Sequence, residues 1–492
     1  MIKELFENIS AGQDIRKSLI ALKQELKQEE ARIELLALLQ GDFSLITELL
    51  NDPDPKVRKN AAMTLGRLDQ DQHVPLLYQA YQREEQLFVK SEYLKAMANL
   101  DCSSCRTSLE KRLEELQQVS PAKEEEKHFR EELAALRKLV DMGASHKKHR
   151  FQGYDDTWEI ILSTGKKHQN ITAKQLKDGK SAILKSGVRL ITSRIKSVLE
   201  IRTYRELLFL LNSKQISGEP KEAARALAES NLLLLLEKAF QSEDDFYFRL
   251  SLHSPRSLEQ RSAFTKKCAF ALEQETGGRL KNSASDYEVE IRLMENRKGQ
   301  FLPLIKLSGL EDERFSYRKH TVAASIRPEQ AALIAMLAKQ YMKENAQVLD
   351  PFCGVGTMLI ERDRVCRAEY LYGVDIFGEA IIKARENAEL AGREIYYINR
   401  DFSEFTHEYL FDEIITNMPD RGKRDKEAHD RIYQMLFDQA QELLKGQGRM
   451  FVYSNEKNYV KKQLRLHKQF TLLQEYGMDD KECYFLFIIE KK

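Results

Sequence analysis

The chain has 492 residues, of which 42% are hydrophobic and 32% are charged, and its 78 Lys and Arg against 77 Asp and Glu give a formal net charge of +1. This composition excludes a disordered or fibrous chain, and the length predicts roughly three domains. No apolar run approaches the roughly 20 residues that cross a bilayer, the start at residues 1–7 is too acidic for a signal peptide, and six scattered cysteines fit a reducing compartment, so we expect a cytoplasmic protein without membrane contact.

Residues 1–143 are predicted to form successive helices, because apolar residues recur three and four positions apart. The apolar pattern of residues 57–68 recurs 32 residues later, at 89–100. Before the first copy, the prolines and aspartates of residues 51–58 can end one helix and cap the next. This pattern resembles HEAT-like repeats, whose helix pairs stack into a solenoid, although a small helical bundle without a repeat is the alternative. We expect this region to be a scaffold or a surface for a protein partner.

A domain boundary is expected near Gly143, where a strongly charged stretch follows the helices. Over residues 144–320, short β-rich runs alternate with helical ones, which predicts an α+β domain. The predicted strands include residues 158–162, 246–252, 287–293 and 301–307, and the predicted helices include 220–240 and 256–275.

Residues 166–205 are strongly basic. They contain eleven Lys or Arg and only Asp178 and Glu200 as acids, so this segment carries a net charge of +9. Such density is the electrostatic footprint expected for binding a phosphate backbone. The alternative is a solvated surface neutralised in space by acids from elsewhere in the chain.

Residues 321–492 are predicted to form a Rossmann-like α/β domain, because strands and helices alternate from Asn345 onward. A parallel sheet of this kind has helices on both faces and binds ligands at the carboxyl ends of its strands. A short turn joins the last two strands, which are therefore expected to pair antiparallel. The expected strands lie at about residues 346–350, 370–375, 395–400, 411–417, 448–454, 469–476 and 483–490.

Residues at the ends of the first three of these strands suit S-adenosyl-L-methionine. Gly354 and Gly356 let the backbone approach a ligand where the next helix begins, a feature shared with nicotinamide and flavin enzymes. Asp350 would be awkward beside a pyrophosphate but suits the cationic amino group of a methionyl moiety. Asp375 is placed to accept both ribose hydroxyls. Asp401 is placed to accept the adenine amino group.

These strand ends also have simpler structural interpretations, in which Asp375 caps a helix and Phe402 is a core aromatic residue. We favour the cofactor because all three strand ends match it together. The predicted cofactor-binding residues here are Asp350, Phe352, Gly354, Gly356, Thr357, Asp375, Ile376, Asp401, Phe402 and Asn417.

The fourth strand runs into the turn Asn417-Met418-Pro419, which we predict to be catalytic. An exocyclic amine on a base is a poor nucleophile, because its lone pair is delocalised into the ring. If Asn417 Oδ1 and the carbonyl of Met418 both accept from that amine, the lone pair can be aimed at a methyl group. The alternative is an ordinary turn in which Asn417 bonds its own backbone and Pro419 fixes the bend.

Several stretches of residues 155–490 resemble the putative RNA methylase family of class I methyltransferases: the run that ends at 307–310, the junction 314–320, the helix from Ser325, the loop 350–357 and the turn 416–419 with 422–424 behind it. The resemblance implies methylation of the exocyclic amine (N2) of a guanine in tRNA or rRNA, with a THUMP-like RNA-binding region at 144–320. It also implies that Ser325, Ile326 and Pro328 complete the cofactor pocket.

The chain departs from that family pattern at one position. The family usually has an aromatic residue after the proline of the turn, where it stacks on the target base, but here Asp420 follows Pro419. Because an acid cannot stack, Tyr433 or Phe352 would have to substitute, or the domain methylates slowly or not at all.

Taken together, the sequence predicts an S-adenosyl-L-methionine-dependent RNA methyltransferase that acts on guanine N2 in structured RNA. One alternative is an adenine N6 methyltransferase, and another is a non-catalytic RNA-binding or assembly protein built on the HEAT-like region. No metal site is expected, because Cys102 and Cys105 have no second ligand pair at a suitable distance.

Overall fold

The computed structural model describes residues 1–492 except 118, 120, 123, 144–147, 213–215, 423, 480 and 482, and at 117 and 141–143 it describes the backbone alone. The chain forms two compact units, residues 1–147 and 148–492. The start of the predicted middle domain at residue 144 lies outside the described residues, as do Lys423 of the 422–424 motif and Asp480 of the predicted edge turn. The division into three domains stays a prediction.

The first unit is helical throughout its described residues. Asp54 caps the helix that follows it, since its carboxylate accepts from the backbone N–H of Lys56 at 2.8 Å and Pro55 occupies the first helical position. The helices are α1 (Ile2–Ser10), α2 (Ile15–Glu25), α3 (Glu29–Leu39), α4 (Ser44–Thr47), α5 (Pro55–Arg67), α6 (Val74–Arg83), α7 (Leu87–Met97), α8 (Arg106–Gln117) and α9 (Glu126–Gly143).

Helices α5 and α7, which carry the two copies of the repeated pattern, pack against each other. Gly66 of α5 is buried at their contact, where a Cβ atom would overlap the carbonyl of Ala96 on α7. The repeated apolar residues of both helices are buried, for example Leu65 and Leu94, each with no exposed surface.

We expect Gly66→Ala to destabilise the protein, because the added methyl group forces α5 and α7 apart. Overpacking costs about 1–3 kcal/mol, which outweighs the gain of about 1 kcal/mol in helix propensity. Urea unfolding of the full chain measures this change, and Gly446→Ala is the control because a Cβ atom there meets nothing within 4 Å. Equal stability of the two variants would contradict the close approach of the helices.

The second unit begins with an eight-stranded sheet in the order β2-β3-β1-β4-β8-β7-β5-β6. Only the pairs β5–β6 and β5–β7 are parallel. The strands are β1 (Trp158–Ser163), β2 (Lys180–Leu184), β3 (Gly187–Thr192), β4 (Leu207–Leu210), β5 (Phe246–His253), β6 (Leu280–Asn282), β7 (Val289–Glu295) and β8 (Phe301–Leu307).

Helices build a hydrophobic core with this sheet. The predicted helix 220–240 is two helices, because the chain leaves the helical path at residues 229–231. The helices are α10 (Gln169–Ala173), α11 (Ile195–Val198), α12 (Pro220–Ala228), α13 (Leu232–Phe240) and α14 (Leu258–Glu275). The mixture of helices and sheet confirms an α+β arrangement for this part of the chain.

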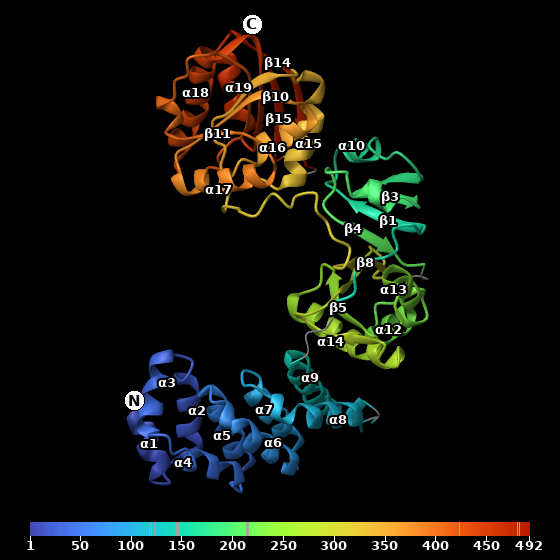
Figure 1. Ribbon diagram of the computed structural model, residues 1–492, viewed down its shortest axis with the longest axis vertical. Coiled ribbons are helices and arrows are strands. Elements are labelled where there is room, and N and C mark those ends of the chain that lie inside the picture. Colours follow the sequence, from blue (N-terminus) through green and yellow to red (C-terminus); the bar gives the residue numbers. More distant parts are fainter. Residues whose placement is uncertain are drawn as a thin grey trace. The chain divides into compact units, whose positions relative to one another are not determined.

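The rest of the second unit contains a seven-stranded sheet in the order β11-β10-β9-β12-β13-β15-β14. Figure 1 labels β10, β11, β14 and β15 of this sheet, with helices around it. The first five strands in this order are parallel. The last two strands, β14 and β15, pair antiparallel as predicted, and β15 also pairs antiparallel with β13. The strands are β9 (Ala346–Asp350), β10 (Ala368–Asp375), β11 (Tyr396–Asn399), β12 (Phe411–Asn417), β13 (Leu444–Ser454), β14 (Phe470–Gly477) and β15 (Phe485–Lys491).

Both faces of this sheet are covered by helices, which confirms the predicted α/β arrangement. Residues of three helices share one core with the sheet, and residues of two others share a second core on its opposite face. The first group is α15 (Pro328–Ala338), α16 (Thr357–Val365) and α17 (Gly378–Leu390), and the second is α18 (Lys426–Leu443) and α19 (Lys457–Leu466).

A buried ion pair ties the basic segment to helix α16. The guanidinium of Arg202 donates to both carboxylate oxygens of Glu361, at 2.8 and 2.6 Å, and the Tyr317 hydroxyl donates to the same carboxylate at 2.7 Å. The Glu361 side chain is only 1% exposed. Since Thr357 begins this helix at the strand ends, the ion pair connects the basic segment to the edge of the sheet where ligands are expected.

Candidate functional site

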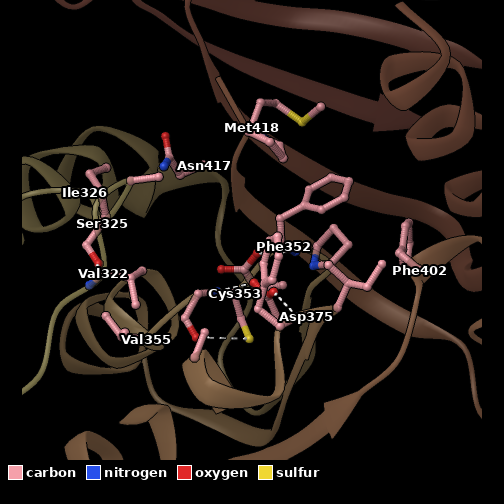
Figure 2. Close-up of a pocket in the computed structure, with 18 of the residues that line it drawn as sticks. Val322, Ser325, Ile326, Phe352, Cys353, Val355, Asp375, Phe402, Asn417 and Met418 are labelled. Carbon is pink, nitrogen blue, oxygen red and sulfur yellow. Dashed lines mark hydrogen bonds between the residues drawn. The ribbon is translucent and has the colours of Figure 1, made fainter. Parts of the chain in front are cut away.

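A cavity of about 640 Å³ lies at the carboxyl ends of β9, β10 and β12 (Figure 2). Twelve of the predicted site residues line it, together with Ile326. Those twelve are Ser325, Asp350, Phe352, Gly354, Thr357, Asp375, Ile376, Asp401, Phe402, Asn417, Met418 and Pro419.

Asp350 is a buried carboxylate on the wall of this cavity. Its Oδ1 accepts from the backbone N–H of Phe352 at 3.1 Å, its Oδ2 is buried next to the Thr416 side chain, and among the described residues no cation forms a salt bridge with it. Burial raises the pKa of Asp350 to about 7, although hydrogen bonds from the Thr416 side chain and the Phe352 backbone act against this rise, and the negative charge of Asp375 adds slightly to it. The hydroxyl of Thr357 is buried without a hydrogen-bond partner in the described structure. An unpaired carboxylate facing a cavity fits the cationic amino group of S-adenosyl-L-methionine.

Cofactor affinity is therefore expected to rise with pH, because the cationic amino group pairs only with the ionised Asp350. With a pKa of about 7, the ionised fraction and the affinity rise about eightfold between pH 6 and 7.5. Isothermal titration with S-adenosyl-L-methionine measures the change. Asp350→Asn should bind weakly and without this pH dependence, and a wild-type affinity that stays constant over this range would contradict the role of Asp350.

The raised pKa of Asp350 also makes the folding stability of the cofactor-free protein depend on pH. Between pH 4 and pH 7 folded Asp350 keeps a proton that the unfolded chain has lost, so stability falls as the pH rises through this window. Thermal unfolding without cofactor should show this decline, and Asp350→Asn should remove it.

The glycine loop before α16 is held in place by Asp375. One carboxylate oxygen of Asp375 accepts from the backbone N–H of Gly354 at 2.8 Å, and the other accepts from that of Phe377 at 2.9 Å. Gly354 and Gly356 have φ values of +52° and +82°, which favour glycine. Asp375 therefore orders the loop and the start of α17 while it also lines the cavity.

At the end of β11, Asp401 and Phe402 have structural contacts and also line the cavity. Asp401 accepts from the backbone N–H and the hydroxyl of Ser403, at 2.9 and 2.7 Å, so it caps a short 3₁₀ turn. Phe402 is buried and packs edge-on against Phe352, with ring centroids 5.9 Å apart. Both Asp401 and Phe402 nevertheless border the cavity.

Two predicted residues are not on the cavity wall. Pro328 begins α15, and Gly356 lies just before α16, where a Cβ atom would overlap the hydroxyl of Tyr397. Sequence reasoning missed Phe377, an exposed residue of the cavity wall. It follows Asp375 by only two residues in the sequence, and this closeness to the end of β10 could have revealed it. Other wall residues that were missed include Val322, Glu379, Ile432 and Met435.

Asn417 lies where this cavity meets a second one of about 740 Å³, since it lines both. The backbone N–H of Met418 donates to the carbonyl of Tyr453 at 2.9 Å, which continues the β12–β13 pairing into the turn. Within the described part of the chain, the side-chain amide of Asn417 has no hydrogen-bond partner, so it does not bond its own backbone. Figure 2 shows Asn417 on the side of the cavity where Ser325 and Ile326 lie, and Met418 on the side of Phe352.

The second cavity, which we call the cleft, is lined by loop residues that flank β1 and β4 and by residues of the α/β part. Lys166 and Arg205 come from the basic segment, and Arg327 and Lys481 come from the α/β part. Tyr453 and Tyr484 stack in the cleft wall with centroids 5.3 Å apart. Residues of the basic segment therefore line the same cleft as Asn417.

The suggestion that Tyr433 stacks on a target base is wrong. Its side chain is fully buried on α18, and its hydroxyl pairs with that of Ser454 at 2.7 Å. Phe352 lines the cofactor cavity and not the cleft. The aromatic side chains that do line the cleft are Tyr453 and Tyr484.

Two stretches of the chain match known family models. Residues 316–478 match the family model UPF0020, described as an RMKL-like methyltransferase domain, and residues 43–124 match HEAT repeats. These matches confirm the expected HEAT-like repeats and a methyltransferase domain. They agree with S-adenosyl-L-methionine as the cofactor, which the unpaired carboxylate of Asp350 also fits. No curated protein sequence matches the chain.

Solved structures share the fold of the larger part of the chain. TrmN from Thermus thermophilus superposes with a TM-score of 0.53 at 20% identity, over 68% of this chain and 100% of that one. SMU.472, a putative methyltransferase complexed with SAH, gives 0.51 at 16% identity over 68% and 97%. A predicted N6-adenine-specific DNA methylase from Listeria monocytogenes gives 0.50 at 15% identity over 68% and 96%. At these identities the likeness establishes the fold alone.

Among the described residues, no three His, Cys, Asp or Glu side chains are grouped so that they could hold a metal ion. None of the described helices is both long and apolar enough to cross a membrane.

Proposed function

We propose that the chain is an S-adenosyl-L-methionine-dependent RNA methyltransferase that methylates the exocyclic amine (N2) of a guanine in tRNA or rRNA. The observation that carries this proposal is the position of Asn417. Its unpaired amide lies where the cofactor cavity meets a cleft lined by cationic and aromatic side chains.

The cofactor would lie against Asp350, the glycine loop, Asp375 and Asp401, and when bound it supplies an electrophilic methyl group. Asn417 Oδ1 and the carbonyl of Met418 accept the two amine hydrogens of the base and so orient the nitrogen lone pair. Pro419 fixes the turn that brings these two acceptors together. Because orientation supplies the rate enhancement, little acid-base catalysis is required. The proton released from the methylated amine leaves to solvent through the open cleft.

Residues 144–320 would serve as a THUMP-like RNA-binding region. The cations that line the cleft suit phosphate groups, and the stacked tyrosines suit an unstacked base. A base inside a duplex would have to be flipped out to reach Asn417. The HEAT-like helices would offer a surface to a protein partner, and we propose a cytoplasmic location for the enzyme.

The test is incubation of the purified chain with unmodified tRNA and rRNA and methyl-labelled cofactor, followed by nucleoside analysis by mass. We expect labelled N2-methylguanosine. Labelled N6-methyladenosine instead would replace the guanine assignment by the adenine alternative. Retained RNA binding without any transfer would favour a non-catalytic RNA-binding protein.

A further inference from the structure

Asp420 stands at the boundary between the cofactor cavity and the cleft, and it lines both. Its carboxylate is exposed, and Oδ1 accepts from the side-chain amide of Asn455 at 3.0 Å. The guanidinium of Arg424 donates to the backbone carbonyl of Asp420 at 3.0 Å, which braces the turn after Pro419. Among the described residues no cation forms a salt bridge with the Asp420 carboxylate, so Oδ2 remains available as an acceptor.

The surroundings of Asp420 point to a flat polar ligand. The stacked pair Tyr453 and Tyr484 lines the same cleft, and Asn417 lies three residues before Asp420 with its own amide unpaired. Burial and then the negative charge of Asp420 raise the pKa of Tyr484, which places this charge beside the tyrosine ring. Asp420 therefore offers an anionic acceptor and Asn417 a neutral acceptor in the same cleft, which has an aromatic wall.

We propose that Asp420 selects guanine by accepting its N1–H while Asn417 holds the adjacent N2 amine. This inference rests on the proposed function and names the group that sets its base specificity. The Watson–Crick edge of guanine presents N1–H and N2–H₂ side by side, and both are donors. Adenine presents an unprotonated N1 beside its amine, and that lone pair would face the Asp420 carboxylate. Asp420 cannot stack on a base, and it instead recognises guanine by accepting a hydrogen bond from it.

The inference predicts how activity changes when either partner of this hydrogen bond is altered. Asp420→Asn keeps the shape but loses the negative charge, so kcat/KM for the guanine substrate should fall about 10- to 100-fold, as for loss of a charge-assisted hydrogen bond. Replacing the target guanine by 2-aminopurine, which keeps the amine but lacks N1–H, should lower wild-type kcat/KM by a similar factor. It should change the activity of Asp420→Asn much less, because the Asn side chain has an N–H₂ group that can donate to the unprotonated N1 of 2-aminopurine.

The experiment uses the full chain and unmodified tRNA and rRNA, from which the methylated transcript is identified and then remade with 2-aminopurine at the target position. Glu427→Gln, an exposed charge change on the nearby helix α18, is the control and should behave as wild type. Cofactor affinity, measured for every variant, shows that each protein is folded. The inference is wrong if Asp420→Asn keeps more than half of the wild-type activity, or if it still discriminates fully against 2-aminopurine. A wild-type chain that methylates no guanine overturns the proposed function and this inference together.

Discussion

Asn417→Ala is expected to slow methyl transfer far more than it weakens cofactor binding, if the turn after β12 works as proposed. Removing one preorganised hydrogen-bonding group from an active site lowers kcat by about 10²–10³-fold. The loss should appear mainly in kcat. The affinity for S-adenosyl-L-methionine should fall much less, because Asn417 is one of several residues on the cavity wall and Asp350, Asp375 and Asp401 remain. Steady-state kinetics on the identified RNA and isothermal titration with the cofactor measure the two quantities separately.

The conservative variant Asn417→Asp provides the control for this experiment. Its carboxylate keeps an acceptor oxygen at the same place, so part of the activity lost in Asn417→Ala should return. If Asn417→Ala kept more than a tenth of wild-type turnover, Asn417 would not orient the amine. If the wild type and both variants all bound RNA without measurable turnover, the non-catalytic alternative would be favoured.

The strand ends that form the cofactor cavity could be predicted because their signal is local. Most strands of the α/β sheet contain a short apolar run followed by a turn, and six of the seven predicted strands start within two residues of the observed ones. The exception is β13, which begins at Leu444 and not near residue 448. The carboxyl ends of parallel strands lie along one edge of a sheet, so Asp350, Asp375 and Asn417 had to come together there.

Positions that depend on exposure were harder to predict. Strand β2 lies in the basic segment and has no buried residue, so its sequence gives no apolar alternation to detect. Tyr433 could have been predicted correctly, since Leu436, Phe437 and Ala440 follow it at helical spacing and mark a buried face. Burial of Tyr433 in that stripe excludes it from the cleft.

The connection between the basic segment and the α/β sheet could not be predicted, because it depends on residues far apart in the chain. Arg202 and Glu361 are 159 residues apart, and each looks like an ordinary surface charge in the sequence. Only the folded structure shows that the Glu361 carboxylate is buried and that Arg202 is its one salt-bridge partner among the described residues, with Arg364 acting on it from farther away. This arrangement makes the pair sensitive to loss of either member.

Arg202→Ala is expected to destabilise the protein by about 3–5 kcal/mol, because it leaves a buried carboxylate without its counter-ion. The remaining partner, the Tyr317 hydroxyl, cannot neutralise that charge. Urea unfolding of the full chain measures the loss. Arg194→Ala is the matched control, since this arginine of the same basic segment pairs with Asp178 at 2.9 Å but its side chain is 69% exposed, and exposed pairs contribute less than about 1 kcal/mol.

A combined variant separates the unpaired charge from the loss of side-chain packing. Arg202→Met with Glu361→Leu and Tyr317→Phe removes the cation, the anion and the hydroxyl together while it keeps similar volumes, so most of the stability should return. If Arg202→Ala cost no more than Arg194→Ala, the Glu361 carboxylate would not be buried as described. A further outcome is a combined variant that regains stability and binds RNA normally but transfers methyl groups more slowly than the wild type. That result would show that the ion pair also positions the basic segment against the cleft, a role separate from stabilising the fold.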